Sequence, residues 1–251
     1  MIAPAPVPAA GVVLWAPLAE PPRVAEARAA ARALVDRVLA HRALRTGTAA
    51  VAAESALRGA RASAALAGAD VLNGEARSGE VTDPVLAGAL RVHAELARLR
   101  TVWGSSPRQA LARLHLLAAA DLTPQELLGR PLDADAAGVV GRVSALAVGR
   151  TRAPALLVAA VVHGELASAA VFSGGTGVVA RAATRLVLAD RGHDPGLVCV
   201  PEVGHLEAGD YAEALASYGG GDPAPWLRHC AAAALGGARE ALAVAEAIAR
   251  G

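Results

Sequence analysis

Apolar residues recur at helical spacing along most of the chain. Between residues 23 and 44, arginines and acids occupy one helical face, and the other carries Val24, Ala27, Ala31, Leu34, Val35 and Val38. A double proline precedes this run and suits the start of a helix. Similar spacing predicts further helices at 49–66, 83–100, 107–120, 133–148, 209–218 and 223–250, with a short extended link at 197–201.

Strand signals are almost absent from the sequence, and no internal repeat is evident. We therefore expect an all-α fold, a bundle of about eight to ten helices in a single domain over residues 23–251. Residues 1–22 are rich in proline and alanine, and we expect a tail there, tied to the body by residues 12–15. An apolar fraction of 54% is ample for a buried core.

Composition excludes several classes of function. The net charge is only +1 and aromatic residues make up 2% of the chain, which argues against a nucleic-acid binder. The longest apolar run, 153–162, is about half of the roughly 20 residues that a membrane span needs. Residues 1–22 lack the basic start of a secretory signal, so we expect a cytoplasmic protein without membrane contact. Cys199 and Cys230 have no metal-ligand spacing and are expected to be buried, reduced thiols.

A glycine-rich turn between two apolar helices is the strongest candidate site. The first helix is expected to end at Phe172, the turn to span 173–177, and the second helix to stop at Gly192. Glycines at a helix start let backbone N–H groups converge on an anion, although a tight corner that only glycine fits is the alternative. Arg181 and Arg185 share a face one turn apart. Each could instead pair with Asp190, Glu202 or another acid within the bundle, and for Arg185 this alternative is favoured. The expected anion- or nucleotide-binding residues are Phe172, Ser173, Gly174, Gly175, Thr176, Gly177, Arg181 and Arg185.

The turn resembles the motif of the Fic/Doc family, H-x-F-x-(D/E)-G-N-G-R-x-x-R. The residues that match it are Phe172, Gly175, Gly177 and Arg181. The motif histidine, acid, asparagine and first arginine are replaced by Ala170, Gly174, Thr176 and Val178, respectively. The resemblance therefore implies a Fic-like helical bundle that has kept the scaffold of the motif and lost most of its chemistry.

Two other segments are similar to parts of the same family. Residues 63–68, S-A-A-L-A-G, resemble its inhibitory motif S/T-x-x-x-E-G/N, with Ser63, Ala67 and Gly68 in register and alanine replacing the glutamate. Because that glutamate occupies the second motif arginine, the resemblance implies that Arg181 is free; a plain helix end is the other interpretation. Residues 114–131 resemble the leucine-histidine helix and flap, with Gly129 and Arg130 in the flap, and 211–218 resemble a closing helix. In total the resemblance covers roughly residues 50–220.

The family mechanism needs groups that are missing here. The histidine takes a proton from a target hydroxyl, and the acid holds Mg²⁺ on the nucleotide phosphates, whereas Ala170 and Gly174 can do neither. His163 lies seven residues before Ala170, about 10 Å along a helix, and is expected to be a satisfied buried histidine. His193 and His205 are weak catalytic candidates in predicted loops. They form no metal-binding spacing with Asp194, and no metal is expected.

Two classes of function stay open. One is a degenerate Fic-fold protein that binds or regulates a protein partner and keeps some nucleotide or anion affinity at the turn. The other is a nucleotidyl- or phosphoryl-group transferase, similar to AMP transferases, with a base such as His205 or His193. The missing base and metal ligand favour the first class. ATP or another nucleotide is the cofactor that the resemblance implies, without clear Mg²⁺ dependence, and a homodimer is an open alternative for the partner.

Overall fold

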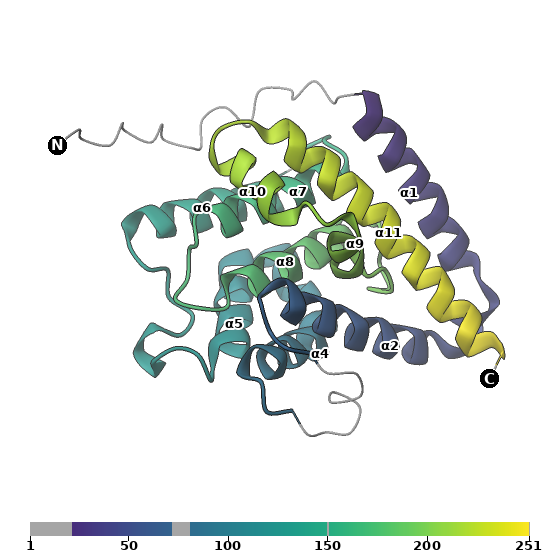
Figure 1. The fold of residues 1–251 in the computed structure, drawn as a ribbon, viewed down its shortest axis with the longest axis horizontal. Helices are drawn as coiled ribbons and strands as arrows, with labels where there is room; N and C mark the ends of the chain where they lie inside the picture. The colour runs from purple at the N-terminus through teal and green to yellow at the C-terminus, as the bar shows by residue number, and fades with distance from the viewer. Residues whose placement is uncertain (1–21, 72–80, 150, 251) are drawn as a thin grey trace.

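The computed structural model describes residues 22–71, 81–149 and 151–250, and it is all-α, as predicted (Figure 1). The described part contains ten α-helices and one 3-10 helix. Apart from Pro22, which begins α1, the predicted tail lies outside the described residues, and so does its expected contact through residues 12–15. The elements are α1 (Pro22–Ala40), α2 (Arg42–Leu66), α4 (Pro84–Ser105), α5 (Pro107–Ala119), η1 (Gln125–Leu127), α6 (Ala134–Val148), α7 (Ala155–Ser168), α8 (Thr176–Asp190), α9 (Pro201–Ala208), α10 (Tyr211–Gly219) and α11 (Pro223–Arg250).

Helix α8 lies at the centre of the bundle, packed against α7, α4 and α5 (Figure 1). Every residue from Val178 to Ala189 is buried. A helix with apolar or small residues on all sides has no face suited to water, so burial from all directions is its stable arrangement. Two arginines, Arg181 and Arg185, are buried within this stretch and need partners inside the protein.

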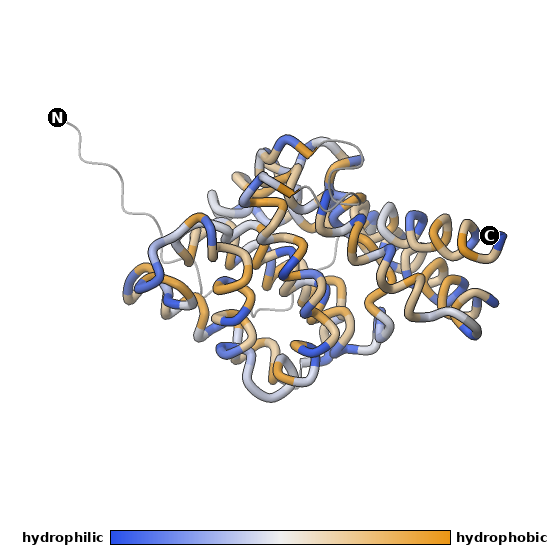
Figure 2. The backbone as a smooth tube through the Cα atoms, turned by 90° about the horizontal axis from the view of Figure 1, so that it is seen from below, coloured by the Kyte–Doolittle hydropathy of each residue, from blue (hydrophilic) through white to orange (hydrophobic). Residues whose placement is uncertain are grey.

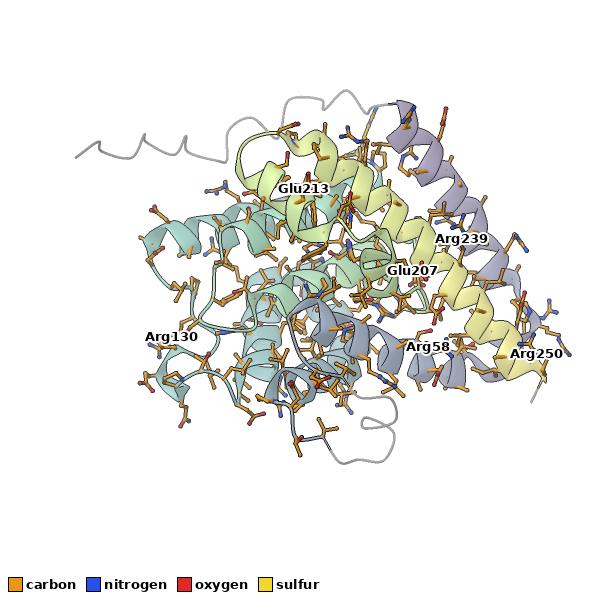
Figure 3. All side chains as sticks on the ribbon, viewed as in Figure 1. Arg58, Arg130, Glu207, Glu213, Arg239 and Arg250 are labelled. Atoms are coloured by element: carbon orange, nitrogen blue, oxygen red, sulfur yellow. The ribbon has the colours of Figure 1, made fainter. Side chains whose placement is uncertain are left out.

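A second apolar cluster joins α1, α2 and α11 at one end of the molecule. Val35 and Val38 of α1 pack there with Val51 of α2 and Val244 of α11. Figure 2 shows the C-terminal end of α11 extending beyond the main body, with apolar and polar positions alternating along the helices. At this end, Arg58 of α2, labelled in Figure 3, forms an ion pair with Glu240 of α11 at 2.5 Å.

Several predicted helix boundaries differ from the structure. The run 23–44 is divided at His41, which has an extended backbone and caps the start of α2: its Nδ1 accepts a bond from the Ala43 amide at 3.3 Å. Helix α2 therefore begins seven residues before the predicted start at 49 and contains a kink at Gly47. The C-terminal helix, in contrast, has the predicted bounds.

The helix before the glycine turn is shorter than predicted. It ends at Ser168 rather than Phe172, because Ala170 takes a left-handed conformation, with φ 46°, and turns the chain toward the flap. The sequence pattern also missed α9, where an extended link followed by a loop was expected. Pro201 occupies the first turn of this helix and Gly209 follows its end in the left-handed conformation, both ordinary boundary signals.

The predicted cysteine state is confirmed for Cys199, which is buried and unpaired; Cys230 is also unpaired but only half-buried. Within the described ranges, no helix combines the length and apolar character required to cross a membrane.

Candidate functional site

The glycine-rich turn is built from left-handed backbone. Gly174 and Gly175 have φ of 70° and 64°, values at which glycine carries no steric penalty. Gly175 is the N-cap of α8, and no side chain caps the helix. The first-turn amides of α8 are consequently left without a side-chain acceptor, in the arrangement that suits an anion.

His115 of α5 holds the turn in place. Its ring stacks on Phe172, with centroids 4.5 Å apart, and its Nε2 lies 3.0 Å from the Ser173 carbonyl. Its Nδ1 accepts a bond from the Gly129 amide at 2.9 Å, so both ring nitrogens are occupied. Burial lowers the pKa of this imidazole, which favours the neutral ring that these two bonds require. The Thr123 hydroxyl donates to the same Ser173 carbonyl.

The predicted flap contacts the turn directly. The Leu132 amide donates to the Val171 carbonyl at 3.1 Å, and Pro131 forms an isolated antiparallel bridge with Phe172. The flap contains only the short helix η1 and this bridge, in agreement with the short extended flap that was expected. Of its predicted residues, Gly129 reaches the site through His115, whereas Arg130 is exposed at the outer edge of the molecule (Figure 3).

The remaining motif positions offer little to a ligand. The Thr176 hydroxyl is used within the turn, donating to the Phe172 carbonyl at 2.9 Å and accepting from its amide at 3.2 Å. Val178 is buried, with 1% exposure. A side chain at position 174 is disfavoured by the positive φ and by the Thr123 hydroxyl, which would lie 2.9 Å from its Cβ.

The expectation that Arg181 is free is wrong. Its Nε donates to the Ser63 hydroxyl at 2.8 Å, and a terminal nitrogen donates to the Ser63 carbonyl at 2.8 Å. The other terminal nitrogen donates to the Tyr211 hydroxyl at 3.2 Å, and the arginine is only 2% exposed. The serine of the S-A-A-L-A-G segment, rather than a residue at position 67, therefore occupies this arginine.

The same segment is also an ordinary helix end. Ala67 follows the last residue of α2, and its amide donates to the Ala64 and Ala65 carbonyls. Gly68 then takes a left-handed conformation, with φ 86°. The plain interpretation of residues 64–68 is thus confirmed, and Ser63 is the residue of this segment that reaches the motif helix.

Arg185 pairs inside the bundle, with Glu202 as the acid, as the favoured alternative predicted. One terminal nitrogen lies 3.9 Å from a Glu202 oxygen and 3.3 Å from Nδ1 of His93, and the other donates to the Leu197 carbonyl. Glu202 is fully buried, and desolvation raises the pKa of its carboxyl. Desolvation lowers the pKa of His93 well below its ordinary value, with Arg185 and Arg181 adding to the effect.

The remaining histidine candidates make their described contacts away from the turn. His205 is a buried residue of α9, not a loop residue, and its Nδ1 lies 2.8 Å from Nε2 of His229. His163 is buried, as expected, and its Nε2 bonds the Tyr211 hydroxyl at 2.8 Å, but its Nδ1 has no hydrogen-bond partner among the described residues, so it is satisfied only in part. His193 is buried, and its carbonyl accepts from Arg32. Among the described residues, no group of three or more His, Cys, Asp or Glu side chains could hold a metal ion.

Two residues of the site were missed by the sequence analysis. Thr123 lies in the turn after α5, and a threonine before a proline was the signal that a side chain could fix a turn there. Tyr211 begins α10 and bridges Arg181 and His163 through its hydroxyl. A scarce aromatic residue in a chain with only two tyrosines was its only signal.

A comparison with solved structures identifies the fold. No protein-family model matches the chain, and no curated protein matches it. The crystal structure of a Fic family protein from Desulfovibrio desulfuricans G20 matches with a TM-score of 0.74 and 17% sequence identity, over 89% of this chain and 75% of that one. Identity at this level establishes the fold alone. The chain has the all-helical fold of a Fic family protein.

Proposed function

We propose that this chain is a Fic-fold binding protein that does not transfer AMP and that keeps weak anion affinity at the glycine turn. The observation that carries the proposal is the state of Arg181, the one motif cation that is retained. It is buried and bonded to Ser63 and Tyr211, so it is not available to nucleotide phosphates in this conformation.

The absence of a base at the turn supports the loss of transfer chemistry. Ala170 has no proton acceptor in its side chain. Of the seven histidines, His115 contacts the turn, and both of its nitrogens are already bonded. General-base catalysis contributes about 10²- to 10⁴-fold to such reactions. The alternative of a transferase that uses His193 or His205 gains no support, because their described contacts lie elsewhere.

The remaining groups favour weak binding through the backbone. The amides at the start of α8 lack a side-chain cap and are directed at the turn. Gly174 offers no metal ligand, and the Thr176 hydroxyl is bonded within the turn. Without a metal and without a free arginine, the turn supplies only a few neutral donors to an anion, which gives low affinity.

The first test is transfer of labelled AMP from ATP. The purified chain is incubated with labelled ATP, with Mg²⁺ or Mn²⁺, both alone and with a mixture of cellular proteins. An active AMP transferase serves as the positive control in parallel reactions. We expect no label on protein above the level of a heat-denatured sample. Metal-dependent labelling of any protein hydroxyl would overturn the proposal.

The second test is calorimetric titration of ATP and GTP, with and without Mg²⁺. We expect the wild type to bind each nucleotide with a Kd weaker than about 1 mM, and Mg²⁺ to have no effect. Ser63→Ala removes one of the two bonds that Ser63 makes to Arg181, because the main-chain carbonyl remains. The variant should strengthen nucleotide binding by an amount that Arg181→Ala cancels. Micromolar binding by the wild type that Arg181→Ala abolishes would contradict the proposal, because it would show that Arg181 is available to nucleotide.

A further inference from the structure

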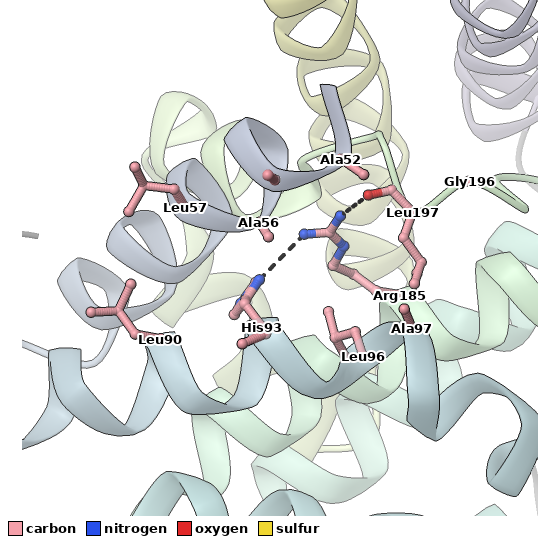
Figure 4. A pocket seen from close by; sticks show the side chains of 12 residues that line it. Ala52, Ala56, Leu57, Leu90, His93, Leu96, Ala97, Arg185, Gly196 and Leu197 are labelled. Carbon is pink, nitrogen blue, oxygen red and sulfur yellow. Dashed lines mark hydrogen bonds between the residues drawn. The ribbon is translucent and has the colours of Figure 1, made fainter. Parts of the chain in front are cut away.

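A cleft opens between α2 and α4, away from the glycine turn. Its volume is about 420 Å³, within the range of small-molecule sites. Figure 4 shows the guanidinium of Arg185 beneath α2, between His93 and the Leu197 carbonyl. Apart from these two polar side chains, the lining consists of alanine, leucine and glycine.

The sequence of the two helices creates this space. Five alanines line the cleft where longer side chains would fill it, namely Ala52, Ala53, Ala56, Ala94 and Ala97. Gly59, which is not a lining residue, lets α2 pass close to the polar pair. A Cβ at this position would lie 2.9 Å from a terminal nitrogen of Arg185 and 2.7 Å from Cε1 of His93. The polar pair thus has room against α2 only because residue 59 is glycine.

Arg185 has unused hydrogen-bonding capacity. A guanidinium carries five N–H donors, and the described contacts use two, to His93 and to the Leu197 carbonyl. Its Nε is buried without a hydrogen-bond partner among the described residues. A buried cation with unmatched donors carries a desolvation penalty that a bound anion would relieve.

The nearest acid, Glu202, does not accept a hydrogen bond from Arg185. Glu202 lies 3.9 Å from Arg185, and neither of its oxygens has a hydrogen-bond partner within the described part of the chain. It is fully buried and is not part of the cleft lining. Burial raises the pKa of its carboxyl, and its oxygens lie beyond hydrogen-bond distance of Arg185, so the Nε donor of Arg185 stays unmatched among the described residues. Arg181 bonds only hydroxyl and carbonyl oxygens, so neither buried arginine has a hydrogen-bonded carboxylate.

From this geometry we infer that the α2–α4 cleft binds a monocarboxylic acid with a compact apolar body. The carboxylate accepts hydrogen bonds from Arg185, and the apolar body lies against the alanine walls. Planar, bidentate recognition of a carboxylate is the interaction for which a guanidinium is best suited. The inference does not depend on the proposed function, because the site uses neither the turn nor Arg181.

The test is calorimetric titration with octanoate and 3-phenylpropionate as probes. Octan-1-ol retains the apolar body without the charge, and acetate retains the charge without the body. We expect at least one of the two acids to bind, with octanol and acetate weaker by at least about tenfold. Excess ATP should not compete, which separates this site from the glycine turn.

Variants locate the binding site without removing its cation. Ala56→Leu fills the cleft from a partly exposed wall position and should weaken the better acid by at least about tenfold. Ala145→Leu makes the same change at an exposed site on α6 and should leave affinity unchanged. Arg185→Gln, checked for native circular dichroism, should abolish the preference for acid over alcohol. The inference is overturned if neither acid binds, if octanol binds as tightly, or if the two leucine variants behave alike.

Discussion

Two buried serines on one helix allow the bond to Arg181 to be measured. Ser63 and Ser55 both belong to α2, and both are fully buried. The Ser63 hydroxyl accepts from Nε of Arg181 at 2.8 Å, whereas the Ser55 hydroxyl has no hydrogen-bond partner among the described residues. The same substitution, serine to alanine, therefore removes a charged hydrogen bond at one position and only an unmatched hydroxyl at the other.

The expected effects on stability differ in size and can differ in sign. A hydrogen bond to a charged group contributes about 1.5–3 kcal/mol, so Ser63→Ala should lower the free energy of unfolding by that amount. Ser55→Ala should change it by less than about 0.5 kcal/mol or raise it, because burial of an unpaired hydroxyl is unfavourable. The assay is urea-induced unfolding followed by far-UV circular dichroism, with unchanged slopes as the check on two-state behaviour.

A third variant separates the bond from simple loss of packing. In an Arg181→Met background, Ser63→Ala has no cation to leave unsatisfied, and its cost should fall below about 1 kcal/mol. Equal effects of Ser63→Ala and Ser55→Ala in the wild type, or an undiminished cost in the Arg181→Met background, would refute the assignment of Ser63 as the partner of this arginine.

Two further predictions follow from burial and close packing. Stability should fall as the pH is lowered from about 7.5 to about 5.5, because only the histidines of the unfolded chain take up protons there. Below pH 6.5 the loss is up to about 1.4 kcal/mol per pH unit for each histidine that is buried in its neutral form. The raised pKa of Glu202 makes stability change with pH in the opposite direction and offsets one histidine at most. The histidines with strongly lowered pKa values are His93, His163 and His205. Urea unfolding at the two pH values measures this, and a flat profile contradicts it. Gly204→Ala should destabilise by about 3 kcal/mol or more, since its Cβ would lie 2.0 Å from a carbonyl oxygen of α11, whereas Gly138→Ala on the exposed face of α6 should stabilise by about 0.5–1 kcal/mol; thermal unfolding of both variants tests the contrast.

The sequence predicted those features that depend on local pattern. Long helices such as α11 have many periodic positions, and the glycine pattern correctly placed the turn that contains Gly175 and Gly177. Short elements were less accessible, because the eight residues of α9 provide only about two turns of periodicity. The break at His41 was missed because neither glycine nor proline marks it.

The pattern of apolar and polar residues could not predict contacts between segments that are far apart in the sequence. Ser63 and Arg181 are 118 positions apart, and their bond depends on how α2 is placed along α8. The sequence showed that the glutamate of the inhibitory motif is absent at position 67. The loss of that glutamate does not mean that Arg181 is left without a hydrogen-bond partner in the fold. A buried cation is stable only with partners, so the protein supplies other oxygens. Ser63 and Tyr211 provide them here.

The placement of α2 against α8 links the two arginines. On α8, Arg181 and Arg185 are one turn apart, and on α2 their respective neighbours, Ser63 and Gly59, are also one turn apart. A shift of α2 by one turn would bring a side chain against Arg185 and take the hydroxyl away from Arg181. Both arginines therefore favour the same register of these two helices. This register explains the two residue types on α2. Position 63 needs a hydrogen-bond acceptor because Arg181 is matched from within the chain, and position 59 needs a glycine because Arg185 must reach the cleft.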